Sequence, residues 1–216
     1  MKKSVLIAVA FAGSLAFTAA DAEPSASHGF YGQVSTGYLQ LEDVGGTIGG
    51  TSVNGEYDAG WSLSGAVGFA FGNGLRSEFE LGYGRSSYNS VSIGGTKVGL
   101  SGDIDMWSAY EAVYYDFDLG SAASYLGGVK PYLGGGFGFV HWDAGNVSAT
   151  VNGTTFTGSG GNGTDFSAFG EAGLSLALSD RIDLVPAVRY IWVNDGESGL
   201  DDDTAWLFKV GMRYRF

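Results

Sequence analysis

The sequence contains no cysteine, so it can form neither disulfide bonds nor thiolate metal sites. Proline is also rare, at three of 216 residues. Past the N-terminal segment, no apolar run approaches the roughly 18 residues that a transmembrane helix needs. Lys and Arg number 11 against 23 Asp and Glu, which excludes the basic patch that nucleic-acid binding requires. This composition therefore argues against a disulfide scaffold, a helical membrane protein and a nucleic-acid-binding protein.

Glycine and aromatic residues are abundant instead, with 38 Gly, 14 Phe, 12 Tyr and 5 Trp. A glycine-rich chain is often disordered, but disordered chains lack aromatic and β-branched residues. The combination favours many short strands joined by turns. Two classes of secreted protein fit this pattern, a soluble β-sandwich and a membrane β-barrel.

The first 22 residues have the layout of a signal peptide. Lys2 and Lys3 precede an apolar run over residues 5–17, and a small-x-small cleavage site ends at Ala22. We expect residues 1–22 to be removed and residues 23–216 to form one mature domain. A membrane anchor is the alternative, but the run is shorter than the ~20 residues of a spanning helix.

Period-two alternation predicts strands through the rest of the chain. In residues 61–71 the large apolar side chains fall on one parity, and Ser, Gly and Ala fall on the other. Residues 205–216 alternate in the same way. Eight such segments are expected: 30–41, 57–71, 75–86, 104–117, 130–142, 165–178, 182–193 and 204–216. The parity of the fourth and fifth segments is ambiguous, because aromatic residues occupy both faces.

The connections between these segments alternate in length. Residues 72–74, 118–129 and 179–181 form the shorter ones, and four polar stretches form the longer ones: 42–56, 87–103, 143–164 and 194–203. Transmembrane barrels show this alternation, with short periplasmic turns and longer extracellular loops. The prediction is an all-β, eight-stranded antiparallel up-and-down barrel in the bacterial outer membrane, with both chain ends on the periplasmic side.

Charged residues lie in the middles of the predicted strands, on the faces opposite the apolar side chains. In a barrel these faces point into the lumen, where charges must be paired. Five acids and five bases are assigned to this lumen network: Arg76, Glu78, Glu80, Glu111, Glu171, Asp183, Arg189, Lys209, Arg213 and Arg215. An eight-stranded barrel is just wide enough for side chains to fill it, so we expect a salt-bridged plug. The alternative is a solvated charged face of an open sheet.

Aromatic residues near the strand ends are expected to form the two interfacial girdles of such a barrel. The residues assigned to the girdles are Tyr31, Tyr57, Trp61, Phe71, Tyr88, Trp142, Trp192, Trp206, Tyr214 and Phe216.

The C-terminus resembles the assembly signal of bacterial outer-membrane proteins. Lys209, Gly211, Tyr214 and Phe216 occupy its polar, glycine and aromatic positions. The resemblance implies recognition by the barrel-assembly machinery. The segments 29–32, 114–117, 130–138 and 178–181 are similar to the OmpA/OmpX-like, opacity-type family of small surface barrels. That family includes adhesins, antigens and proteins described as porins, so it implies a fold and a location more than one activity.

Catalysis is not expected. Some small outer-membrane barrels resemble this chain in size and deacylate lipid A with a His and a Ser two residues apart. Here His141 is followed two residues later by Asp143, and His28 precedes the first strand, so no nucleophile–base pair can be named. The glycine clusters are not followed by a Gly-Lys-Ser/Thr motif, so no phosphate-binding loop is implied and no cofactor is expected.

The excess negative charge is predicted to lie on the extracellular loops. The acids there are Glu42, Asp43, Glu56, Asp58, Asp103, Asp105, Asp143, Asp165, Asp195, Glu197, Asp201, Asp202 and Asp203. This rim could collect divalent cations and couple the barrel to lipopolysaccharide in the surrounding lipid; no metal site is assigned. Two functions remain open: a surface antigen or adhesin that binds an extracellular ligand through its loops, and a passive porin for small solutes.

Overall fold

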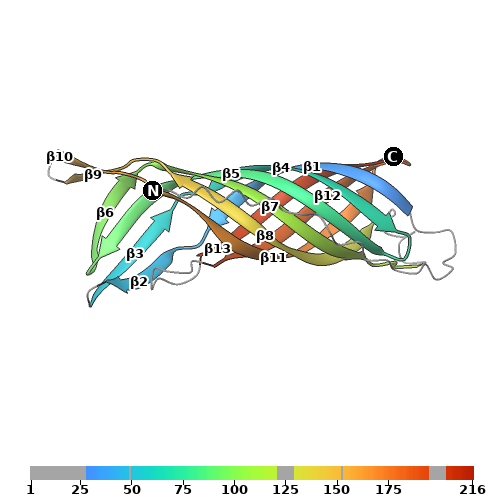
Figure 1. The fold of residues 1–216 in the computed structure, drawn as a ribbon, viewed down its shortest axis with the longest axis horizontal. Helices are drawn as coiled ribbons and strands as arrows, with labels where there is room; N and C mark the ends of the chain where they lie inside the picture. Colours follow the sequence, from blue (N-terminus) through green and yellow to red (C-terminus); the bar gives the residue numbers. More distant parts are fainter. Residues whose placement is uncertain (1–27, 49, 121–128, 152, 195–202) are drawn as a thin grey trace, which may run out of the picture.

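The computed structural model describes residues 28–48, 50–120, 129–151, 153–194 and 203–216 (Figure 1). Every regular element in these ranges is a β-strand, and none is a helix that could cross a membrane. Eight antiparallel strands form the barrel: β1 (His28–Leu41), β4 (Gly60–Phe71), β5 (Leu75–Ile93), β7 (Asp103–Asp116), β8 (Lys130–Ala144), β11 (Asn162–Ala177), β12 (Ile182–Val193) and β13 (Asp203–Arg215). The prediction of an eight-stranded antiparallel barrel is confirmed.

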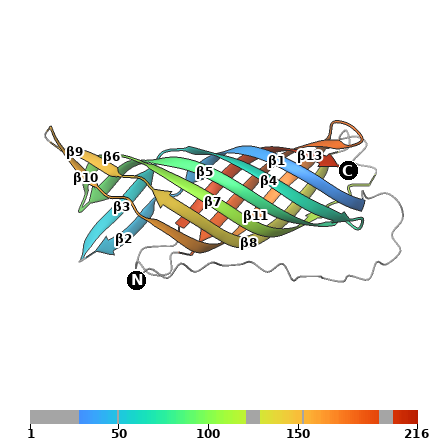
Figure 2. The same cartoon turned by 45° about the horizontal axis from the view of Figure 1, so that its top comes forward.

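The barrel closes without a free edge. Its strands pair in the cyclic order β1-β4-β5-β7-β8-β11-β12-β13, and β13 returns to pair with β1 from Tyr31↔Arg215 to Leu41↔Ala205. The strands run obliquely around the long axis of the molecule (Figure 2). Closure pairs the strand backbones with one another, which is what a sheet in hydrocarbon requires.

One end of the barrel carries the tight connections and both ends of the described chain. The β4–β5 turn contains Gly72 and Gly74, whose φ angles of 82° and 88° lie in the left-handed region that favours glycine. Between them, the Asn73 side chain accepts a hydrogen bond from the Leu75 amide at 3.1 Å. Short turns of this kind mark the periplasmic end of a transmembrane barrel.

The opposite end extends well past the barrel as a sheet (Figure 1). Its strands are β2 (Val44–Ile48), β3 (Thr51–Tyr57), the C-terminal part of β5, β6 (Thr96–Ser101), β9 (Val147–Val151) and β10 (Thr154–Gly158). Neighbouring strands pair in the order β2-β3-β5-β6-β9-β10. Three of the four stretches predicted as loops, 42–56, 87–103 and 143–164, are therefore largely strands. Each hairpin finds a partner strand in its neighbour, which a reading of isolated segments cannot detect.

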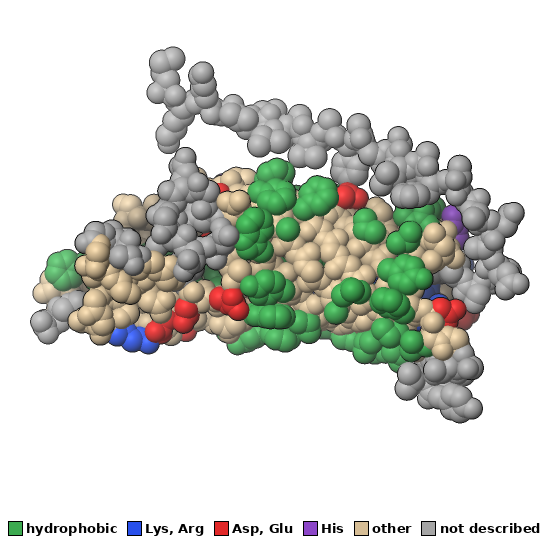
Figure 3. All heavy atoms as spheres, turned by 90° about the horizontal axis from the view of Figure 1, so that it is seen from below, with side chains coloured by type: hydrophobic (Ala, Val, Ile, Leu, Met, Phe, Trp, Pro, Cys, Tyr) green, Lys and Arg blue, Asp and Glu red, His purple; other side chains and the backbone are tan. Residues whose placement is uncertain are grey.

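The outer surface of the barrel is apolar. Trp61, Leu63 and Val67 on β4 are each about half exposed or more, as are Phe208 and Met212 on β13. Hydrophobic side chains gather in two bands across the barrel wall, separated by a belt of small residues and backbone (Figure 3). This is the arrangement of a lipid-facing surface with a girdle at each interface.

Candidate functional site

The centre of the lumen holds a closed ring of four charged side chains. Arg189 contacts Glu80 at 2.5 Å (Nη1–Oε1) and Glu171 at 2.7 Å (Nε–Oε2). Lys209 Nζ lies 3.0 Å from Glu80 and 3.1 Å from Glu171. Each acid therefore meets both bases, and every side chain in the ring is at most 4% exposed. Two positive and two negative charges balance, as buried charges must.

The ring spans the full width of the barrel. Glu171 and Arg189 are direct neighbours across the β11–β12 pairing, and Lys209 follows on β13. Glu80 comes from β5, which is separated from β12 by three strands in either direction around the barrel. The Arg189–Glu80 pair therefore joins opposite walls and crosses the lumen.

Buried aromatic residues complete this plug. Tyr132 donates a hydrogen bond to Glu171 at 2.8 Å, and Tyr114 accepts one from Arg189 Nη2 at 3.3 Å. The Arg189 guanidinium also lies 3.8 Å from the centre of the Phe169 ring, a cation–π distance. The sequence predicts a charged lumen but not these inward aromatic rings. On the fourth and fifth predicted segments aromatic residues occupy both faces, so alternation alone does not show which of them point inward.

A second polar cluster lies between the ring and the short-turn end. Arg76 Nε donates to Asp116 at 2.9 Å, and Arg76 Nη1 lies 3.6 Å from Glu78. Tyr31 donates to Glu78 at 2.9 Å and is 2% exposed, so its side chain points into the lumen. The assignment of Tyr31 to a lipid-facing girdle is therefore wrong, because its hydroxyl finds a carboxylate inside the barrel. Arg215 pairs with Asp183 at 2.8 Å nearer the short-turn end of the barrel.

Arg213 is the remaining interior base, and it has a different environment. It is 5% exposed and donates to two neutral oxygens, Gln33 Oε1 at 3.1 Å and Ser175 Oγ at 3.2 Å. The structure thus places nine of the ten residues assigned to the lumen network on inward faces, grouped in two clusters rather than one.

Glu111 is the exception, and its assignment to the lumen is corrected. On β7 the buried side chains are Tyr110, Ala112 and Tyr114, so Glu111 has the outward parity. Its carboxylate accepts a hydrogen bond from Ser77 at 3.1 Å on the outer face of β5. The tyrosines take the inward positions because their hydroxyls reach Ser167 and Arg189 there.

The extracellular extension contains several of the predicted rim acids in local contacts. Lys97 Nζ lies 2.5 Å from Glu56, and Arg85 Nη2 lies 2.5 Å from Asp103. The hydrogen bonds from Lys97 and Ser90 hold the pKa of the Glu56 carboxyl below its usual value. Tyr57 and Tyr88, predicted for a girdle, contact each other in this region with ring centres 5.4 Å apart and ring planes tilted by 38°. Asp195, Glu197, Asp201 and Asp202 lie outside the described residues, as does the predicted signal peptide, residues 1–22.

Two of the four residues of the C-terminal signal face the lumen, and the other two face outward. Lys209 belongs to the central ring, and a side chain at Gly211 would come within 2.4 Å of Ser35 Oγ in the lumen. Tyr214 and Phe216 point outward and are 41% and 78% exposed. The inward pair thus has a packing role in the finished barrel, whereas the outward pair stays accessible at its surface.

The two histidines lie apart, at opposite ends of the barrel wall. His141 on β8 shares a hydrogen bond of 2.8 Å with Thr164 Oγ1, and His28 stacks edge-on against Phe69. In the part of the chain that the structure describes, no group of three or more His, Asp or Glu side chains is placed to hold a metal ion.

An apolar exterior, a closed strand cycle and a charged interior together define a transmembrane β-barrel. The family model of the outer membrane protein beta-barrel domain matches residues 7–216. The chain belongs to this family and is located in the bacterial outer membrane.

Solved structures share this fold. Neisserial surface protein A is 24% identical with a TM-score of 0.52, over 89% of this chain and 99% of that one. The outer membrane protein OprG from Pseudomonas aeruginosa is 15% identical with a TM-score of 0.57, over 88% and 97%. No curated protein sequence matches the chain significantly. At these identities the likeness concerns the fold alone.

Proposed function

We propose that the protein is a surface-interaction protein, an adhesin or antigen whose barrel is sealed and whose extracellular sheet contacts a ligand. The observation that carries this proposal is the central ring of Glu80, Glu171, Arg189 and Lys209. It joins opposite walls of the barrel with contacts of 2.5–3.1 Å and excludes solvent from its own side chains. Opening such a ring would strand buried charges, which costs several kcal/mol.

A sealed lumen leaves the extracellular extension as the surface available for function. Its hairpins pair into one sheet, so they form a regular, hydrogen-bonded surface and not a set of separate loops. On β10 all five residues are exposed, including Phe156 at 61%. Among the described strands β10 pairs with β9 alone, so its other edge presents backbone groups that a partner strand can bind.

Catalysis is not part of the proposal. His141 shares a hydrogen bond with Thr164 on the wall, and His28 packs on an aromatic ring at the other end, so the two histidines do not share a site. We also propose that lipopolysaccharide surrounds the barrel. The exposed Tyr214 and Phe216 support recognition of the C-terminus by the barrel-assembly machinery.

Trimming the extension tests the proposed role. In the trimmed variant, short turns replace residues 45–54, 92–97 and 148–157. Bacterial cells that display the variant or the wild type are compared, and the adhesion of these cells to host-type cell layers and extracellular matrix is measured. The matched control is E80Q/R189M, which alters the lumen and leaves the surface intact. We expect trimming to abolish adhesion and the control to retain it. Equal adhesion by wild type, trimmed variant and cells without the protein would overturn the proposal.

A further inference from the structure

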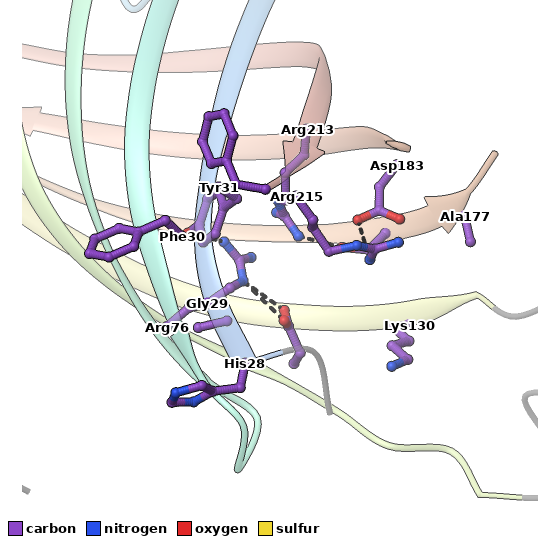
Figure 4. A pocket seen from close by; sticks show the side chains of 14 residues that line it. His28, Gly29, Phe30, Tyr31, Arg76, Lys130, Ala177, Asp183, Arg213 and Arg215 are labelled. Atoms are coloured by element: carbon purple, nitrogen blue, oxygen red, sulfur yellow. Dashed lines mark hydrogen bonds and ion pairs between the residues drawn. The ribbon is translucent and has the colours of Figure 1, made fainter. Parts of the chain in front are cut away.

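The periplasmic mouth of the barrel contains a cavity of about 200 Å³ beside the second polar cluster (Figure 4). Four cationic side chains line it, Arg76, Lys130, Arg213 and Arg215, against two acidic ones, Asp116 and Asp183. The chain as a whole carries a net charge of −12, so a cationic cavity runs against its composition. Figure 4 shows that these side chains come from different strands and converge on the same space.

Both acids in the cavity are already engaged. Asp116 receives Arg76 Nε at 2.9 Å, and Asp183 receives Arg215 Nη1 at 2.8 Å. Among the described residues, no carboxylate lies within 4.0 Å of the Arg213 guanidinium. The hydrogen bonds of this buried base go to neutral oxygens, so no acid is paired directly with its charge.

Two guanidinium nitrogens in this cavity also lack hydrogen-bond acceptors. Arg76 Nη2 and Arg213 Nη2 are both buried and unbonded, on side chains 2% and 5% exposed. The two guanidiniums lie near the same ring, 5.9 Å and 5.1 Å from the centre of Tyr31. Buried donors of this kind require an acceptor, and such an exception in a folded protein calls for an explanation.

We propose that this cavity binds a small oxyanion of the phosphate or carboxylate type. Guanidinium groups match the oxygens of both anions, and a bound anion would supply acceptors for the two free nitrogens and a counter-charge for Arg213. Lys130, exposed at the rim, would draw the anion in from the periplasm. The volume suits one small group, since sites for larger organic ligands start at about 300 Å³.

Calorimetry with inorganic phosphate tests the site in the refolded mature chain in nonionic detergent. Chloride buffer keeps the ionic strength constant. We expect saturable binding by the wild type, with affinity reduced about tenfold or more in R213Q and in K130Q. R181Q is the matched control, because Arg181 is an exposed arginine at the same end that does not line the cavity. It should bind like the wild type.

Competition identifies the source of the oxyanion. Displacement of phosphate by acetate assigns a carboxylate, and displacement by a short-chain phosphatidic acid alone assigns a lipid headgroup phosphate. A heat-modifiable gel shift verifies that each variant folds. If R213Q does not fold, K130Q alone tests the site. Absence of saturable binding by the wild type, or equal binding by wild type, K130Q and R181Q, would overturn the proposal.

Discussion

Removing Arg189 from the central ring should destabilise the barrel strongly. The side chain is 1% exposed and bonds to Glu80, Glu171 and Tyr114. In R189M the methionine keeps an apolar chain of similar length, but two buried carboxylates then share one base, Lys209. Breaking a buried pair in this way costs about 3–5 kcal/mol of unfolding free energy.

A second substitution separates charge imbalance from lost packing. In E80Q/R189M the ring retains one acid and one base, Glu171 and Lys209, which are 3.1 Å apart. We therefore expect the double variant to be more stable than R189M, with a coupling free energy of about 1–3 kcal/mol. If the loss came from packing alone, removing Glu80 would recover nothing.

Urea unfolding in detergent micelles measures these differences, followed by tryptophan fluorescence and the gel mobility of the folded barrel. All four corners of the cycle, wild type, E80Q, R189M and the double variant, are needed. A loss below about 1 kcal/mol in R189M, or strictly additive losses in the double variant, would refute the ring as a coupled unit.

Three further predictions concern single side chains. E111V should raise the unfolding free energy by about 1 kcal/mol, because an outward carboxylate in the lipid-facing band is replaced by an apolar group. Urea unfolding measures this change, with S77A as the comparison that removes only the hydrogen bond to Glu111. In G68A the new Cβ would lie 2.2 Å from Tyr31, so the ring must move from Glu78, and a loss of about 1–3 kcal/mol is expected; an unchanged midpoint would contradict this. Because the pKa of Glu56 is lowered, its contact with Lys97 stabilises the extension above the unfolded pKa of about 4.3 and is lost as the pH falls through the lower folded value. Pepsin cleavage near residues 90–99 should therefore rise at acidic pH in the wild type and vary less in E56Q; identical pH profiles would exclude this contact.

The barrel strands could be predicted because lipid and lumen impose a strict period of two. On β5, Arg76, Glu78 and Glu80 alternate with residues that are apolar except for one serine, so parity alone assigns the inward face. On β7 the same reasoning fails. Tyr110 and Tyr114 are as apolar as the outward residues by composition, and their hydroxyls decide the face through partners on other strands.

The two polar clusters and the extracellular sheet depend on contacts that are distant in sequence. Glu80 and Arg189 are 109 positions apart, and their meeting follows from barrel closure rather than from any local pattern. Residues 91, 93 and 98 carry an apolar pattern that suits a hairpin, yet glycine, serine and threonine around them also suit a loop. The pairing of β6 with β9 resolves this, and it is visible only in the folded chain.

Whether the lumen is sealed is the central question, and single-channel conductance of the refolded mature protein in a planar bilayer answers it most directly. The variant E80A/R189A, which removes the bridge between opposite walls, serves as the open reference once the gel shift shows that it folds. A sealed lumen gives a silent bilayer for the wild type and discrete conductance steps for the variant. Steady, reproducible steps from the wild type would contradict it and favour the passive porin.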